Sequence, residues 1–215
     1  MMEKMMLNLN SLATMLFTCD LHAYKDAVLT FDEWINVEKN LKVHVLSGPG
    51  CLFGLNADEL MDILDISEYT SYKIVQRMKT MNVFLKHIYE YEQKGIRIIT
   101  KYDEEYPQIL VKKMKKNAPT CLFVVGNLPV EFEGISLTGL QTVTKKEKGC
   151  IKRLVDKINN ENKWLISNDC KGVDQEAFQY ALHHHGHIIS FLCEKMEDKA
   201  MEYKRYIRSG NLVLL

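Results

Sequence analysis

The sequence lacks the features that mark secreted, membrane-spanning and zinc-binding proteins. No apolar run approaches the roughly 18 residues that a membrane span requires. The first residues, MMEKMMLNLN, carry charged and polar groups where a signal peptide needs a continuous apolar core. None of the six cysteines forms a C-x-x-C pair, so the spacing indicates neither a zinc knuckle nor a dithiol redox site. We therefore expect a cytoplasmic protein, without membrane attachment, whose cysteines are reduced and mostly buried.

The chain also lacks net charge, because 28 Lys and Arg residues balance 28 Asp and Glu residues. This balance argues against a protein that coats nucleic acid through positive charge alone. The charge is unevenly distributed, since residues 111–171 contain 12 Lys or Arg but only six Asp or Glu. Such a basic stretch indicates a local anion-binding site, although a solvated face with incidental lysines would give the same count.

The 215 residues are enough for one or two domains, and the pattern changes near Gly95. Residues 1–95 have helical apolar spacing, and Thr30–Glu33 and Asn56–Glu59 are capping boxes that open helices. We expect a small helical N-terminal domain over residues 1–95, with helices at 7–17, 31–37, 57–64 and 67–93.

Residues 96–215 alternate short apolar runs with amphipathic segments of about a dozen residues, which is typical of βαβ units. The predicted fold class is α/β, a Rossmann-like parallel sheet with helices on both faces, preceded by the helical domain. Strands are expected at residues 96–100, 121–125, 135–138, 164–167, 188–193 and 212–215. Helices are expected at residues 145–160, 173–185 and 198–208.

Two loops are placed to bind an anion. In an open α/β sheet, ligands bind beyond the carboxyl ends of the strands, where helix N-termini present free N–H groups. The first loop, residues 138–144, precedes a lysine-rich helix start, and the second, residues 167–174, contains Lys-Gly-Val-Asp. Asp174 has a second interpretation, as a helix cap. The candidate phosphate-binding residues are Gly139, Gln141, Thr144, Lys145, Lys146, Lys148, Ser167, Lys171, Gly172 and Asp174.

These segments, in their order and spacing, carry a family resemblance. The matching segments are Tyr106-Pro107, Ala118-Pro119 with Gly126 downstream, Thr138 to Gln141, Ser167 to Asp174, Ala181-Leu182 with Gly186, Ile189 to Leu192, and Ser209 to Val213. The chain resembles the DNA processing protein A (DprA/Smf) family over nearly its whole length. Members have a helical N-terminal domain, a V-G-S-R loop and an S-G-L-A-x-G-I-D loop.

The resemblance implies a non-catalytic protein that binds single-stranded DNA and hands it to the recombinase RecA in natural transformation. The implied partners are single-stranded DNA, a RecA-type recombinase and a second copy of the chain, and no cofactor is implied. In the family, an Arg of the first loop and a Lys or Arg before the second-loop glycine contact DNA. Lys171 matches the second position, whereas Gln141 stands in place of the Arg and Phe178 in place of a His.

Other patterns are weaker. The histidines at 183–185 point in different directions on a helix, so we expect no metal site. Ser167, Asp174 and His185 lack a G-x-S-x-G elbow, and the P-G-G-x-G-T motif of related phosphoribohydrolases is missing, so we expect no catalytic residue. Candidate base-stacking rings are more readily explained as packing: Tyr102, Phe178, Tyr203 and Tyr206. Two alternatives stay open, namely a sensor of a nucleotide or nucleotide-derived signal and a regulatory remnant without DNA binding.

Overall fold

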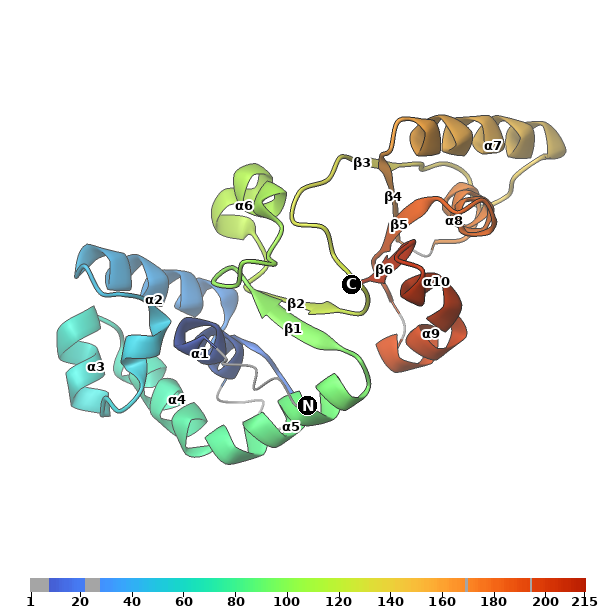
Figure 1. The fold of residues 1–215 in the computed structure, drawn as a ribbon. Coiled ribbons are helices and arrows are strands. Elements are labelled where there is room, and N and C mark those ends of the chain that lie inside the picture. Colours follow the sequence, from blue (N-terminus) through green and yellow to red (C-terminus); the bar gives the residue numbers. More distant parts are fainter. Residues whose placement is uncertain (1–7, 22–27, 169, 194) are drawn as a thin grey trace. The chain divides into compact units, whose positions relative to one another are not determined.

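The computed structural model describes residues 8–21, 28–168, 170–193 and 195–215. The chain divides into two compact units (Figure 1). The first unit contains Met1–Gln93, Ile98–Tyr106 and Leu110–Leu122, and the second contains Lys94–Arg97, Pro107–Ile109 and Phe123–Leu215. The domains predicted over residues 1–95 and 96–215 stay a prediction.

Helices make up most of the first unit. They are α1 (Leu9–Thr18), α2 (Phe31–Val43), η2 (Pro49–Leu52), α3 (Ala57–Leu64), α4 (Glu68–Lys79) and α5 (Met81–Gln93). Both predicted capping boxes are confirmed. The backbone N–H of Thr30 donates to Glu33 Oε2 at 2.6 Å, and that of Asn56 donates to Glu59 Oε2 at 2.8 Å. These bonds satisfy amide groups that a helix start otherwise leaves unpaired.

The prediction of one long helix over residues 67–93 is wrong, because the helix is interrupted at Thr80, between α4 and α5. Thr80 Oγ1 donates to the carbonyl of Arg77 at 2.8 Å and so caps the end of α4. Arg77 is fully buried, and its guanidinium donates to the carbonyls of Leu16 at 2.6 Å and Cys19 at 2.9 Å. The apolar stripe continues through the break, so the sequence pattern alone did not reveal it.

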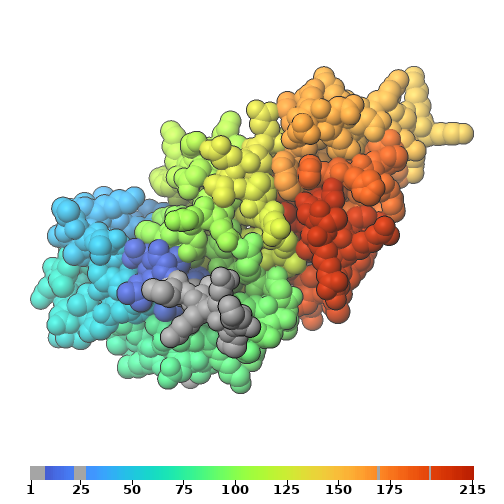
Figure 2. Space-filling model, viewed as in Figure 1, coloured from blue at the N-terminus to red at the C-terminus, as the bar shows by residue number. Residues whose placement is uncertain are grey.

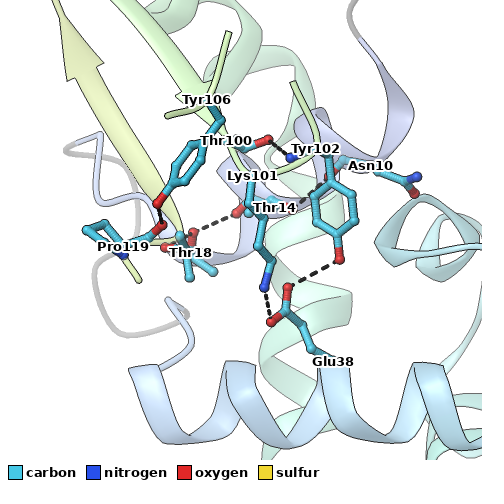
Figure 3. Close-up of polar contacts among 10 residues, drawn as sticks. Asn10, Thr14, Thr18, Glu38, Thr100, Lys101, Tyr102, Tyr106 and Pro119 are labelled. Atoms are coloured by element: carbon cyan, nitrogen blue, oxygen red, sulfur yellow. Dashed lines mark hydrogen bonds and ion pairs between the residues drawn. The ribbon is translucent and has the colours of Figure 1, made fainter. Parts of the chain in front are cut away.

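Polar contacts bind residues 100–103 to the helices of the first unit (Figure 3). Glu38, which is buried on α2, accepts hydrogen bonds from Lys101 Nζ and, at 3.2 Å, from the Tyr102 hydroxyl. Ser11 Oγ on α1 donates to Asp103 Oδ1 at 2.5 Å. Buried polar groups need such partners, because an unpaired one destabilises the fold.

Two segments that the sequence comparison singled out contact each other here. The hydroxyl of Tyr106, a fully buried residue, donates to the carbonyl of Pro119 at 2.7 Å (Figure 3). Burial raises the pKa of Tyr106 to about 12. Tyr106 and Pro119 therefore have a structural role, since they form a hydrogen bond with each other.

The strands form two sheets. One contains β1 (Arg97–Thr100) and β2 (Cys121–Val124), and the other has the order β3-β4-β5-β6, with every neighbouring pair parallel. The strands of the second sheet are β3 (Gly134–Ser136), β4 (Trp164–Ser167), β5 (His187–Ser190) and β6 (Leu212–Leu214). β5 and β6 supply fully buried aliphatic side chains such as Ile188 and Val213. The predicted α/β class, with a parallel sheet flanked by helices behind a helical N-terminal region, is confirmed.

The remaining helices are α6 (Gln108–Met114), η3 (Lys115–Asn117), α7 (Lys145–Asn160), α8 (Val173–His183), α9 (Met196–Glu202) and α10 (Lys204–Arg208). α7 packs on β4, α8 on β4 and β5, and α10 on β6 (Figure 1). The single helix predicted over 198–208 is wrong in one respect: it is divided at Tyr203, which ends α9. Within the described part of the chain, no helix combines the length and apolar character needed to cross a membrane.

The prediction that the cysteines are mostly buried is wrong. We expected mostly buried thiols, but among the six only Cys19 is buried, while Cys170 and Cys193 are exposed. All six are free.

Replacing Tyr106 with Phe should lower the free energy of unfolding by about 1–2 kcal/mol at neutral pH, because the Pro119 carbonyl loses its donor. A tyrosine whose folded pKa is raised contributes this stability fully below its unfolded pKa of about 10, and the contribution disappears as pH rises through about 12. The difference between wild type and Tyr106→Phe should therefore shrink from pH 10 to pH 12 in urea denaturation. Tyr89→Phe is the control, since that ring is 54% exposed. A Tyr106→Phe difference that does not depend on pH would contradict this assignment.

Candidate nucleic-acid interface

The two candidate loops leave the same edge of the parallel sheet. β3 pairs with β4 in a register that aligns Ser136 with Ile166, so both strands end side by side. The loops also touch directly, because the backbone N–H of Val173 donates to the carbonyl of Leu140 at 3.3 Å. The sequence prediction that these loops meet at the carboxyl ends of the strands agrees with this geometry.

Gly139 and Gly172 allow the loops to pack this closely. A Cβ at Gly172 would lie 2.1 Å from the Leu140 carbonyl oxygen and 2.5 Å from Gln141 Cα, and its φ is +96°. A Cβ at Gly139 would lie 2.6 Å from Val173 Cγ2. Both glycines therefore allow the two loops to pack against each other.

Asp174 organises the second loop from inside. One oxygen of its buried carboxylate, Oδ2, accepts hydrogen bonds from Ser167 Oγ at 3.0 Å and from the N–H groups of Asn168 at 3.2 Å and Cys170 at 2.9 Å. These N–H groups are the kind that would otherwise bind a phosphate oxygen. The second loop thus already holds an anion of its own, and Ser167 is fully buried beneath it.

The start of α7 is satisfied in the same way. Thr144 donates to Glu147 Oε2 from its N–H at 2.7 Å and from its hydroxyl at 2.6 Å, and Glu147 N–H donates back to Thr144 Oγ1 at 3.3 Å. The Thr144 bonds lower the pKa of Glu147, which therefore stays ionised. A carboxylate already complements the positive end of this helix dipole.

Free positive charge at the loops comes from lysine side chains. Lys145, Lys146 and Lys171 are exposed, and none forms an ion pair with a carboxylate of the described residues. Lys148 differs, because it pairs with Glu176 and so joins α7 to α8. Gln141 is exposed beside Gly172. The α7 segment, gold in Figure 2, lies at the molecular surface.

The histidines contact separate aromatic rings. His184 stacks on Tyr180 with ring centroids 4.0 Å apart, His183 meets Tyr206 edge-on at 6.5 Å, and His187 lies 4.9 Å from Trp164. Over the residues that the structure describes, no group of three or more His, Cys, Asp or Glu side chains is arranged to hold a metal.

Most of the candidate stacking rings are engaged in packing. Phe178 and Tyr203 are buried and pack edge-to-face at 5.5 Å. Tyr102 donates its hydroxyl to Glu38, as described above. These three rings therefore have contacts within the fold that explain them without base stacking.

Sequence reasoning missed two features of the loops. It did not anticipate that Asp174 would accept three bonds, nor that Glu176 would neutralise Lys148. The signal for the second was present, since an exposed acid in the first turn of one helix often pairs with a lysine of its neighbour. For Asp174 the sequence offers a helix cap as a second interpretation, but its bonds go to the loop before the helix, at Ser167, Asn168 and Cys170, which the sequence pattern does not indicate.

Replacing Gly172 with Ala should destabilise the second unit by about 3 kcal/mol or more, because the Cβ meets backbone atoms and φ is positive. Gly210→Ala is the matched control. Gly210 has φ +78° but nothing within 4 Å of a Cβ, so it should lose only about 1–2 kcal/mol. Urea denaturation measures both, and equal losses would mean that the contact between the loops contributes nothing.

The chain is similar to a known protein family in sequence and to a solved structure in fold. Residues 97–209 match the family described as DNA recombination-mediator protein A. The solved structure of DNA processing protein A from Streptococcus pneumoniae resembles the chain with a TM-score of 0.60 at 19% identity, covering 88% of this chain and 64% of that one. The chain thus spans less than two thirds of the length of that relative. No curated protein matches. Because the family match covers more than half of the sequence, the chain belongs to the DNA recombination-mediator protein A family.

Proposed function

We propose that this chain binds single-stranded DNA, without chemistry of its own, and presents it to a RecA-type recombinase. The observation that carries the proposal is the set of three exposed, unpaired lysines at two loops that share one sheet edge, namely Lys145, Lys146 and Lys171. Membership in a family that acts in DNA processing and recombination supports it. Lys171 also stands where the family resemblance expects a cationic DNA contact.

The expected binding mode depends on which groups of the two loops are free to contact phosphate. Asp174 and Glu147 occupy N–H groups at both loops, so the contacts fall to lysine side chains and to exposed polar groups such as Gln141. Lysine binds phosphate as a mobile point charge, without the paired geometry of arginine. We therefore expect binding that is weak in sequence preference and steep in its dependence on salt.

The partner and assembly steps are further parts of the proposal. A recombinase and a second copy of the chain are the partners that the family resemblance implies. Handover requires that the strand be released, and lysine side chains, which bind phosphate as mobile point charges, allow this release.

Lys171→Ala should weaken binding of a labelled oligo-dT strand and reduce the steepness of the logarithmic salt dependence by about 0.7, the share of one phosphate contact. Fluorescence anisotropy at several salt concentrations measures both quantities. Gln141→Arg should have the opposite effect, with roughly 4-fold tighter binding at 0.15 M salt, because it adds one cation beside Lys171. Lys42→Ala is the control, since Lys42 is an exposed lysine in the last turn of α2. No binding by the wild-type protein at low salt would overturn the proposal.

A nucleotide sensor is a second candidate, supported by a separate pocket. A pocket of about 710 Å³ in the second unit is lined by Lys195, Lys204 and Arg208, and also by the acidic residues Glu197 and Asp198. Small ligands occupy pockets of this size. Thermal unfolding with nucleotides separates the candidates, because a ligand at 100 times its dissociation constant adds about 2.7 kcal/mol of stability. If neither oligo-dT nor any nucleotide binds, the chain is a regulatory remnant of the family fold.

A further inference from the structure

A second cluster of lysines lies outside the two loops, at the end of α6 and in η3. It contains Lys112, Lys113, Lys115 and Lys116, four cations within five residues. All four side chains are exposed, as are Val111 at 38% and Met114 at 42%. Not one residue of α6 or η3 is buried. These residues are named here the α6 lysine cluster.

None of the four cluster lysines forms an ion pair with a carboxylate of the described residues. Many other lysines do, including Lys73 with Glu33 at 2.8 Å, Lys94 with Glu197 at 3.4 Å and Lys163 with Glu161 at 2.9 Å. The chain has no net charge, so these four unpaired lysines concentrate positive charge at one place on it.

Fold stability explains only part of the cluster. Lys112 and Lys113 lie in the last turn of α6, where a cation complements the helix dipole. Lys115 and Lys116 lie beyond that helix, and like charges at such short spacing repel each other. A bound polyanion would remove this repulsion and release its own counterions at the same time.

We propose that the α6 lysine cluster is a second contact site for the phosphate backbone of single-stranded DNA, additional to the two loops. This inference rests on the proposed function, since it names a second contact site for the same ligand. The cluster contains no aromatic ring, so it contacts phosphates without reading bases. Val111 and Met114 offer apolar area to sugars or unstacked bases between those contacts.

Replacing all four lysines with Ala tests the inference. If two to four phosphates contact the cluster, the logarithmic salt dependence of oligo-dT binding becomes less steep by about 1.4 to 2.8. Affinity at 0.15 M salt falls roughly 10- to 200-fold on the same basis. A charge-retaining variant with Arg at the four positions should keep the wild-type slope, which separates loss of charge from loss of folding.

The matched control replaces Lys39, Lys42, Lys79 and Lys86 with Ala, which removes the same charge from helices of the first unit. If wild type binds and the cluster variant matches this control in slope and affinity, the second contact site is refuted while the proposed function stands. If wild type does not bind oligo-dT, both are refuted. If the cluster variant binds DNA normally but loses an acidic protein partner, the surface belongs to that partner and the inference is wrong.

Discussion

The carboxylate of Asp174 is the constraint on which the candidate interface depends. By accepting bonds from Ser167, Asn168 and Cys170, it fixes the loop that follows β4 and fills the space where an external anion would meet backbone N–H groups. Gly172 then lets the first loop rest on the second. Lys171 projects from the second loop, whose N–H groups Asp174 already binds, and Gln141 lies on the first loop where that loop packs against Gly172.

This constraint changes how phosphate recognition would operate in the fold. Helix N-termini bind anions through oriented N–H groups at fixed positions. Here Asp174 takes up N–H groups of the loop before α8, and Glu147 takes up the N–H group of Thr144 at the start of α7, so the external contacts pass to flexible lysines. Such contacts give affinity that depends on salt and tolerates a moving strand, as the proposed function requires. The zero net charge suits the same role, since it limits attraction to other polyanions.

Much of the fold could be predicted from local sequence signals. The residues 145–160 and 164–167 match α7 and β4 at both ends, because a capping box starts the helix and a short apolar run forms the strand. The break at Thr80 was missed because the apolar stripe continues through it, and the Thr80 cap and the Arg77 bonds to carbonyls 58 and 61 residues away are visible only in the folded structure. The loops were located correctly at the sheet edge, but the role of Asp174 depends on its rotamer and depth, which a single sequence does not encode visibly.

Chemical footprinting of lysines can show whether the unpaired lysines at the two loops contact DNA. The intact protein is acetylated with and without oligo-dT, and the acetylation of each lysine is measured by mass spectrometry. We expect DNA to protect Lys145, Lys146 and Lys171, with Lys39 and Lys42 unchanged as exposed references. Equal acetylation of all five lysines with and without DNA, under conditions where DNA is bound, would contradict this expectation.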